Sequence, residues 1–208
     1  MNSLLHIEVS PSGARSLSRS VSAEFGKAWL EKHPGGEIVI RDLAANPIPH
    51  LDAESIAGIR MSKDEQTFSI ANKMAFRKRL IAEILDADDI VFSTPIWNWS
   101  IPSVLKAYFD QIIMNGTLDI SRTRKLAGKK VTFIIAQGSS SAPGTPKEGW
   151  DFATSYLKFI ATQLGSEDVE IIKIEYGLAG IAPGLEAFTD HRAASLAAAK
   201  EAARIRAA

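Results

Sequence analysis

The chain has 208 residues, of which 46% are hydrophobic and 23% charged, proportions typical of one globular domain with a substantial core. Its 24 basic residues balance its 24 acidic ones, so net charge does not indicate nucleic acid or an anionic membrane as a partner. The lack of cysteine excludes disulfides, thiolate nucleophiles and cysteine-ligated metal sites. No apolar run approaches the ~18 residues of a membrane span, and no secretory leader pattern opens the sequence. We therefore expect a single cytoplasmic domain over residues 1–208, with no metal, nucleic-acid or membrane partner.

The N-terminal part of the sequence predicts a βαβ unit. A short apolar run at residues 4–9 is typical of a buried strand, and the turn-forming residues 10–13 end it. A helix with one apolar face follows and ends in the Pro-Gly-Gly turn after His33. Residues 37–43 form a second strand. Because a helix separates the two strands, we expect them to be parallel, with a right-handed crossover.

The middle of the chain predicts a surface excursion, a helix, a strand and another helix. Residues 44–62 contain the sequence Asn-Pro-Ile-Pro, which favours an extended segment that covers one edge of the sheet. A helix is predicted over residues 64–85, a strand buried on both faces at residues 90–92, and a helix from Pro102 to residues 115–116. The expected buried stripe of the first helix comprises Phe68, Ala71, Ala75, Leu80, Ile81 and Ile84.

The C-terminal part adds two strands and two helices. Strands are predicted at residues 130–136 and 169–176, a helix over residues 150–164 lies between them, and an alanine-rich helix runs from Pro183 or Gly184 to the end. Five strands alternating with five helices predict a three-layer α/β sandwich, with helices on both faces of a parallel sheet of order 2-1-3-4-5. Ligands of such sheets bind beyond the carboxyl ends of the strands, where the strand order reverses.

The loop after the first strand is rich in serine and lies at this reversal. Ser10 stands at its start, and Ser16 or Ser18 stands where the first helix begins. A helix N-terminus offers unpaired N–H groups to an anion, and serine hydroxyls add further donors. Neither GxGxxG nor GxxxxGK[ST] is present, so the loop favours one terminal phosphate over a pyrophosphate. The alternative is that a serine simply caps the helix, which is worth about 1 kcal/mol.

The loop after the third strand carries two tryptophans around an asparagine, Trp97-Asn98-Trp99. Indole rings stack on flat π-systems, and an asparagine amide both donates and accepts hydrogen bonds. We expect one of the two tryptophans to pack under the following helix instead. At the end of the fourth strand, Gln137 and Gly138 begin a loop with further donors and a close-approach glycine. A phosphate cradle and an aromatic shelf at one rim together fit flavin mononucleotide (FMN).

The sequence resembles the flavodoxin-like family of FMN-dependent NADH-azoreductases and quinone reductases over nearly its whole length. The resemblance rests on SPSGARSLSRS at residues 10–20, RDLAANPIPHLD at 41–52, PIWNWSIPSVLKAYFD at 95–110, and the strand and loop from Lys130. It implies one FMN per subunit, a homodimer, and ping-pong transfer of hydride from NADH or NADPH to quinones and azo compounds. The cofactor-binding residues that it implies are Ser10, Ser16, Leu17, Ser18, Ile96, Trp97, Asn98, Trp99, Gln137, Gly138, Ser139 and Ser140. No catalytic acid or base is required.

One departure from the family pattern concerns the fourth strand's end. The family typically has S-R-G-G where this chain has Gln137-Gly138-Ser139-Ser140, so two side chains replace two glycines beside the ring and are expected to narrow the pocket or change the substrate preference. Two other functions remain open. A flavodoxin-type electron carrier needs no second-substrate pocket, but such carriers are strongly acidic. A serine hydrolase would use the loop at residues 138–142, where a Pro-Gly pair interrupts the required helix.

Overall fold

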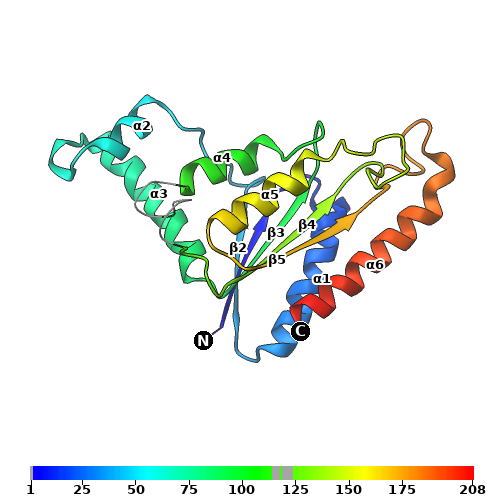
Figure 1. Ribbon diagram of the computed structural model, residues 1–208. Coiled ribbons are helices and arrows are strands. Elements are labelled where there is room, and N and C mark those ends of the chain that lie inside the picture. The colour runs from blue at the N-terminus through cyan, green and yellow to red at the C-terminus, as the bar shows by residue number, and fades with distance from the viewer. Residues whose placement is uncertain (1, 114–117, 119–123) are drawn as a thin grey trace.

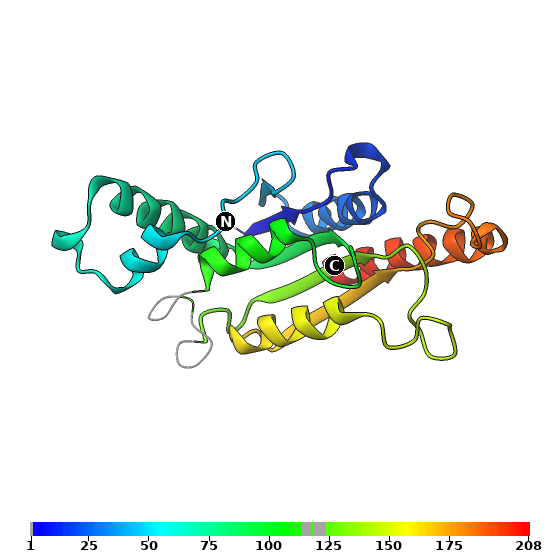
Figure 2. The same ribbon diagram turned by 90° about the horizontal axis from the view of Figure 1, so that it is seen from above.

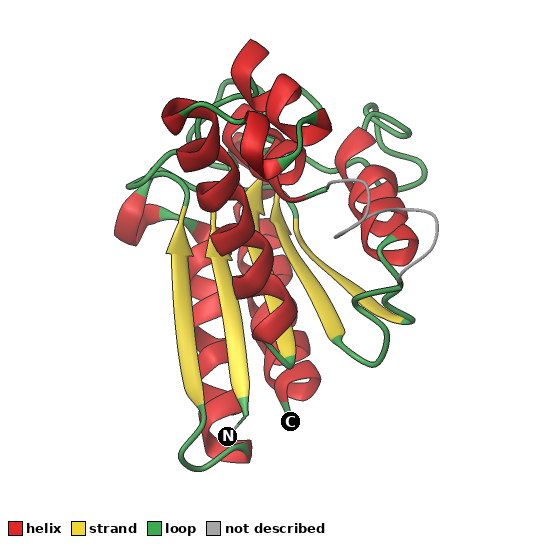
Figure 3. Ribbon diagram, turned by 90° about the vertical axis from the view of Figure 1, so that its left-hand side faces the viewer, coloured by secondary structure: helices red, strands yellow, loops and turns green. Residues whose placement is uncertain are grey.

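The computed structural model describes residues 2–113, 118 and 124–208 of the chain. Five parallel strands form a sheet of order β2-β1-β3-β4-β5 in the described residues, which confirms the predicted topology. All five arrows point the same way (Figure 3). The strands are β1 (Ser3–Glu8), β2 (Glu37–Asp42), β3 (Asp89–Pro95), β4 (Lys130–Ala136) and β5 (Asp168–Ile174).

Helices cover both faces of this sheet. The α-helices of the described residues are α1 (Leu17–Lys32), α2 (Ala53–Arg60), α3 (Phe68–Asp86), α4 (Ser103–Ile112), α5 (Phe152–Gln163) and α6 (Thr189–Ala207). Short 3₁₀ turns accompany them at Gly13–Arg15, Lys63–Glu65 and Glu186–Phe188. The helices α1 and α6 pack on one face and α3, α4 and α5 on the other (Figure 1), so the molecule has three layers.

The apolar run of β3 lies at the centre of the sheet. Ile90 and Phe92 face the layer of α3, α4 and α5, whereas Val91 faces α1 and α6. All three side chains are buried, and the Phe92 ring stacks on Phe133 of β4 at 4.9 Å between ring centroids. A strand covered on both faces buries every side chain, which is why its sequence shows no polar alternation.

The excursion at residues 44–62 contains a helix that was not predicted. Residues Ala53–Arg60 form α2, whose N-cap Asp52 accepts a hydrogen bond from the Ser55 N–H at 2.8 Å. The helix packs on α3, and both extend past the end of the sheet (Figures 1 and 2). The stretch around Pro47 and Pro49 has no regular structure, as expected, but the helix after it was not predicted, so the described residues contain one more α-helix than the five predicted.

The predicted stripe of α3 is only half correct. Leu80, Ile81 and Ile84 are buried against the sheet as expected, but Phe68 is 84% exposed and both Ala71 and Ala75 are also exposed. The buried positions of the first half of the helix are instead Ile70, Met74 and Arg77. The error arises because this half of α3 lies beyond the sheet and packs on α2 instead.

Several element ends also differ from prediction. The last helix begins at Thr189 rather than near residue 183, and β3 continues through Pro95. The expected end of α4 at residues 115–116 lies outside the described residues. In the part of the chain that the structure describes, no helix is long and apolar enough to cross a membrane.

Candidate functional site

Three loops meet at the carboxyl edge of the sheet, where β1, β3 and β4 end. Backbone hydrogen bonds hold these ends together: the Val9 N–H donates to the Ser93 carbonyl at 3.0 Å, and the Ile96 N–H donates to the Ala136 carbonyl at 2.8 Å. The loop after β5 joins the group, because the Gly177 N–H donates to the Gln137 carbonyl at 2.9 Å. The geometry of the sheet therefore brings together the segments that the sequence singled out.

The serine loop forms the first part of the site, a cavity of about 220 Å³ at the N-terminus of α1. Ser16 is the N-cap of α1, and its hydroxyl accepts a hydrogen bond from the Arg19 N–H at 3.3 Å. The Ser16 and Ser18 hydroxyl oxygens lie 3.1 Å apart. The N–H groups of Leu17 and Ser18 belong to the first turn and have no acceptor earlier in the helix. Hydroxyls and free N–H groups thus converge on one cavity, as an anion site requires.

Arg19 holds this loop against the sheet. Its Nε and Nη2 atoms both donate to the Ser10 carbonyl, at 2.9 and 2.7 Å. Nη2 also pairs with the Asp42 carboxylate at 2.8 Å, and Nη1 pairs with Glu8. Burial alone would raise the pKa of Asp42, but hydrogen bonds from backbone N–H groups and from Arg19 lower that pKa overall. The guanidinium therefore ties the ends of β1 and β2 to the start of the cradle.

The tryptophan loop forms a tight turn. Trp97 and Ser100 exchange two backbone hydrogen bonds, of 3.0 and 3.1 Å, and Asn98 and Trp99 between them have φ angles of 48° and 67°. Positive φ at both central residues is the hallmark of a type I′ turn. Trp97 is 44% exposed and Trp99 53%, so the expectation that one of them is a core residue is wrong.

Glu175, at the end of β5, organises the loop after β4. One oxygen of its carboxylate accepts hydrogen bonds from Gln137 Nε2 at 2.6 Å, from the Ser140 hydroxyl at 2.9 Å and from the Ser141 N–H at 3.3 Å. Gly138 lies close to Leu178: a Cβ atom there would be 2.7 Å from Cδ1 of that leucine, whose side chain would have to move. Two of the residues that depart from the family pattern, Gln137 and Ser140, are therefore held by the carboxylate that directly follows β5.

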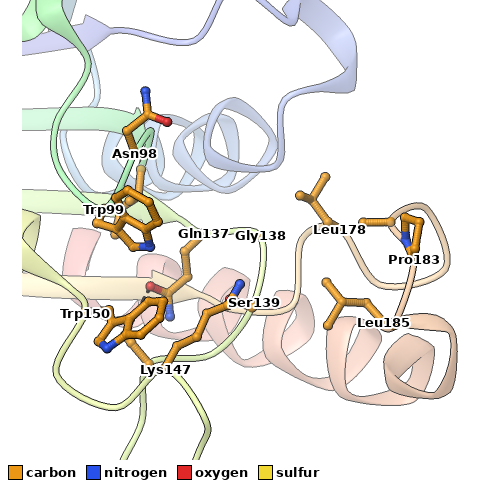
Figure 4. A pocket seen from close by; sticks show the side chains of 14 residues that line it. Asn98, Trp99, Gln137, Gly138, Ser139, Lys147, Trp150, Leu178, Pro183 and Leu185 are labelled. Carbon is orange, nitrogen blue, oxygen red and sulfur yellow. Dashed lines mark hydrogen bonds between the residues drawn. The ribbon is translucent and has the colours of Figure 1, made fainter.

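A second and larger cavity, of about 510 Å³, opens beside the tryptophan turn (Figure 4). Trp99 and Trp150 meet edge to face in its wall, with ring centroids 6.1 Å apart. The Phe152 N–H donates to the Trp99 carbonyl at 3.0 Å and so holds the start of α5 against the turn. Lys147 supplies the only charged side chain among the described residues that line this cavity. The larger cavity thus combines an aromatic wall with one cation.

Most of the predicted site residues line one or both cavities. The predicted residues that line the serine cavity are Ser10, Ser16, Leu17, Ser18, Ile96, Trp97, Gln137 and Gly138. The larger cavity shares Ile96, Gln137 and Gly138 and adds Asn98, Trp99 and Ser139. Ser140 lines neither of them, because its hydroxyl points to Glu175.

Gly177, Leu178, Lys147 and Trp150 are among the lining residues of these cavities that sequence reasoning missed. The sequence could have indicated Gly177 and Leu178, because they follow β5 and neighbouring parallel strands end at the same edge of the sheet. Lys147 and Trp150 stand in a long loop, where no periodic pattern indicates which side chains turn inward.

The serine-hydrolase alternative lacks the necessary geometry. A nucleophile elbow runs directly from a strand into a helix, whereas β4 ends at Ala136 and α5 begins only at Phe152. No histidine is among the described residues that line either cavity. Among the same part of the chain, no three His, Cys, Asp or Glu side chains are grouped as a metal site would need.

A family model described as a flavodoxin-like fold matches residues 2–203. A protein of Frankia casuarinae called FMN-dependent NADH:quinone oxidoreductase is 41% identical and covers 100% of this chain and 99% of its own length. A Nostoc protein of the same name is 39% identical, with coverages of 97% and 96%. The chain therefore belongs to the family of FMN-dependent NADH:quinone oxidoreductases.

Solved structures share the fold. An azoreductase from Bacillus anthracis str. Sterne superposes with a TM-score of 0.86 at 23% identity, covering 100% of this chain and 99% of that one. An FMN-dependent NADH-azoreductase from Bacillus anthracis str. Ames Ancestor, solved in complex with FMN, superposes with a TM-score of 0.84 at 22% identity and full coverage of both chains. At these identities the likeness concerns the fold.

Proposed function

We propose that this protein is an FMN-dependent oxidoreductase that transfers hydride from NADH or NADPH to quinones and azo compounds. The observation that carries the proposal is the pairing of a serine-lined cavity at the N-terminus of α1 with the exposed Asn98–Trp99 turn across the β1/β3 reversal. This is where flavodoxin-like sheets bind FMN. Relatives that match this chain over its whole length carry the name of that activity.

The residues present fit the cofactor. The phosphate needs several donors and little negative charge, and Ser10, Ser16, Leu17 and Ser18 supply hydroxyl and N–H groups at the positive end of α1. In the proposal, the backbone and side chains of residues 96–99 line the isoalloxazine ring, and residues 137–140 meet its other edge. Ser140 acts there indirectly, by holding the loop to Glu175.

FMN, when bound, would supply the redox chemistry, a ring that takes up hydride from NAD(P)H and returns it to an acceptor. The protein's own part is to bind and orient. The serine cradle fixes one end of the cofactor, and Trp99 and Trp150 offer an apolar wall that excludes water from the reacting face. The proposal requires no protein residue to act as an acid or base.

The proposed enzyme is a single-domain homodimer that works in the cytoplasm. The half-exposed apolar side chains around the site, Trp97, Trp99, Trp150 and Phe152, support the dimer, since large apolar groups gathered on one surface are typical of contact regions. Sedimentation at micromolar concentration tests it, and a monomer would contradict it.

The direct test is to titrate the purified protein with FMN and then add NADH without oxygen. We expect yellow flavin absorbance that NADH or NADPH bleaches and that a quinone restores. A protein that binds no FMN, or whose bound flavin neither nucleotide bleaches, contradicts the proposal. A flavodoxin-type electron carrier would bind FMN but would show no steady consumption of NADH with a quinone.

A second test concerns the phosphate cradle. The double change Ser16→Ala and Ser18→Ala removes two hydroxyls from the cavity, so the dissociation constant for FMN should rise at least tenfold, since each hydrogen bond to a charged group is worth ~1.5–3 kcal/mol. Riboflavin has no phosphate, and its affinity should change less than threefold. The control Ser20→Ala removes a hydroxyl that donates to the Leu17 carbonyl outside the cavity. Equal losses for FMN and riboflavin would place the phosphate elsewhere.

A further inference from the structure

The larger cavity has an unbalanced charge. Fourteen residues line it (Figure 4), among them Lys147 but no aspartate or glutamate. No described residue forms an ion pair with Lys147. The nearest carboxylate in sequence, Glu148, accepts a hydrogen bond from the Gly144 N–H at 2.8 Å and so belongs to its own loop. The lining therefore presents one ammonium group and no carboxylate, and the Glu175 carboxylate behind it already accepts hydrogen bonds from Gln137, Ser140 and Ser141.

The loop that carries Lys147 is internally braced. The Trp150 N–H donates to the Lys147 carbonyl at 3.1 Å, and the Thr145 hydroxyl donates to the Ala142 carbonyl at 2.7 Å. From this turn the Lys147 side chain extends past Trp150 toward Ser139 (Figure 4). The cation thus reaches the cavity from the same turn that supplies half of its aromatic wall.

Resting on the proposed function, we propose that this cavity selects planar substrates that carry an anionic group. The aromatic ring of the substrate packs on Trp99 and Trp150, and its anion pairs with the Lys147 ammonium. The anion is a phosphate when the substrate is the nicotinamide dinucleotide, and a sulfonate or carboxylate when it is the quinone or azo acceptor. Lys147 is a specificity residue in this arrangement, since attraction between opposite charges distinguishes substrates that share a ring but differ in charge.

The test compares the two half-reactions of the FMN-loaded enzyme by stopped flow. The variant is Lys147→Gln, and the control is Lys158→Gln, an exposed lysine on α5 that lines neither cavity. The acceptors are 1,4-naphthoquinone and its 2-sulfonate, and the donor is NADH. We expect Lys147→Gln to lower the second-order rate constant for an anionic substrate about tenfold, the effect of one charge pair worth ~1.4 kcal/mol. The constant for neutral naphthoquinone should change less than twofold.

A binding measurement adds a readout apart from turnover. Naphthalene-2-sulfonate, which accepts no hydride, should quench tryptophan fluorescence of the FMN-loaded protein, and Lys147→Gln should raise its dissociation constant about tenfold. High salt should weaken its binding to the wild type far more than to the variant, because salt screens exposed charges. Trp150→Leu should weaken binding of charged and neutral naphthalenes alike.

Each outcome bears on the proposal. A selective loss with the sulfonated quinone assigns Lys147 to the acceptor, and a selective loss with NADH assigns it to the donor. Equal losses for neutral and anionic quinones, or no loss, overturn the proposal. A flavin potential that shifts in Lys147→Gln without charge selectivity also overturns it, because the lysine would then act on the cofactor. Failure of the proposed function is separate, since the wild type would then bind no FMN or resist bleaching.

Discussion

Trp99 has a backbone conformation that bulky residues rarely adopt. Its φ of 67° follows the 48° of Asn98, and asparagine tolerates the left-handed region far better than tryptophan does. Such a conformation costs on the order of 1–3 kcal/mol. The cost persists because the two hydrogen bonds between Trp97 and Ser100 fix the turn. The indole is therefore displayed at the tip of the turn at the expense of backbone strain.

Replacing this tryptophan by glycine distinguishes its contribution to stability from its contribution to substrate turnover. Trp99→Gly relieves the strained φ and removes an indole that is 53% exposed. The free energy of unfolding measured in urea should therefore stay within ~1 kcal/mol of the wild-type value. NADH-dependent quinone turnover should fall at least tenfold. The control Trp29→Ala, at a buried ring whose Nε1 donates to Asp89 at 2.7 Å, should cost about 3–5 kcal/mol. A loss above ~2 kcal/mol for Trp99→Gly would show that the exposed indole also stabilises the fold.

At this scale the sequence predicted three of the loops that line the cavities, but it missed the loop after β5, the loop that carries Lys147, and some side-chain directions. Two segments indicate the site: the serines before α1, which follow β1, and the motif around Asn98, which follows β3. Both strands end at the carboxyl edge of the sheet. Ser140 turns to Glu175 instead, and that direction depends on the conformation of the loop after the strand and on a partner 35 residues away. A hydrogen bond between distant residues leaves no periodic trace in the sequence.

At the scale of elements, the strands were predictable and the α2–α3 arm was not. The core strands are continuous apolar runs between turn residues, a pattern that burial on both faces imposes. This arm consists of α2 and the first half of α3 and extends past the end of the sheet. Contacts between the two helices, and not contacts with the sheet, therefore decide which of its apolar residues are buried. Gly58 of α2 lies against Ile70 and Met74 of α3, where a Cβ atom would come within 2.7 Å of Ile70. The buried Arg77 further along α3 also breaks the apolar stripe.

Enlarging Gly58 tests the packing of this arm. Gly58→Val forces a side chain into the α2–α3 contact, and such overpacking typically costs ~1–3 kcal/mol. Amide hydrogen exchange should become faster in α2 before it changes in the central strands, because the arm can open locally. The control Ala53→Val lies at an exposed position of the same helix. FMN affinity should be unchanged; a loss of FMN binding would show that the arm supports the site directly.

At the scale of the whole molecule, stability is coupled to pH through one buried histidine of β1. Burial, and secondarily the charge of Arg19, lowers the pKa of His6 from 6.5 to about 4. Its Nε2 atom has no hydrogen-bond partner among the described residues and lies 3.9 Å from a carboxylate oxygen of Glu8, which is itself paired with Arg19. Between about pH 4 and pH 6.5 the His6 imidazole is therefore mostly neutral in the folded protein and mostly protonated in the unfolded chain.

The sign of the effect follows from this difference. Below pH 6.5 the unfolded state binds a proton that the folded state refuses until about pH 4, so stability falls as the pH falls through this window. The loss from His6 should reach about 2 kcal/mol by pH 5. The test measures the free energy of unfolding in urea at pH 7.5 and at pH 5. His6→Leu should remove most of the loss between these two pH values, whereas the control His50→Gln, at an exposed histidine, should leave that loss unchanged. An unchanged pH dependence in His6→Leu would show that other groups cause the acid sensitivity.

The wall of the larger cavity opposite the tryptophan turn is a hairpin-like segment, residues 178–185. Two of its hydrogen bonds close within the segment, from the Gly180 N–H to the Leu185 carbonyl and from the Ala182 N–H to the Leu178 carbonyl. Its first residue is tied to the loop after β4, because the Leu178 N–H donates to the Gly138 carbonyl at 3.0 Å, and Leu178 lines both cavities. Exchange of residues 179–185 would therefore change the range of acceptors, whereas a change at Leu178 would also reach the cavity proposed for the cofactor.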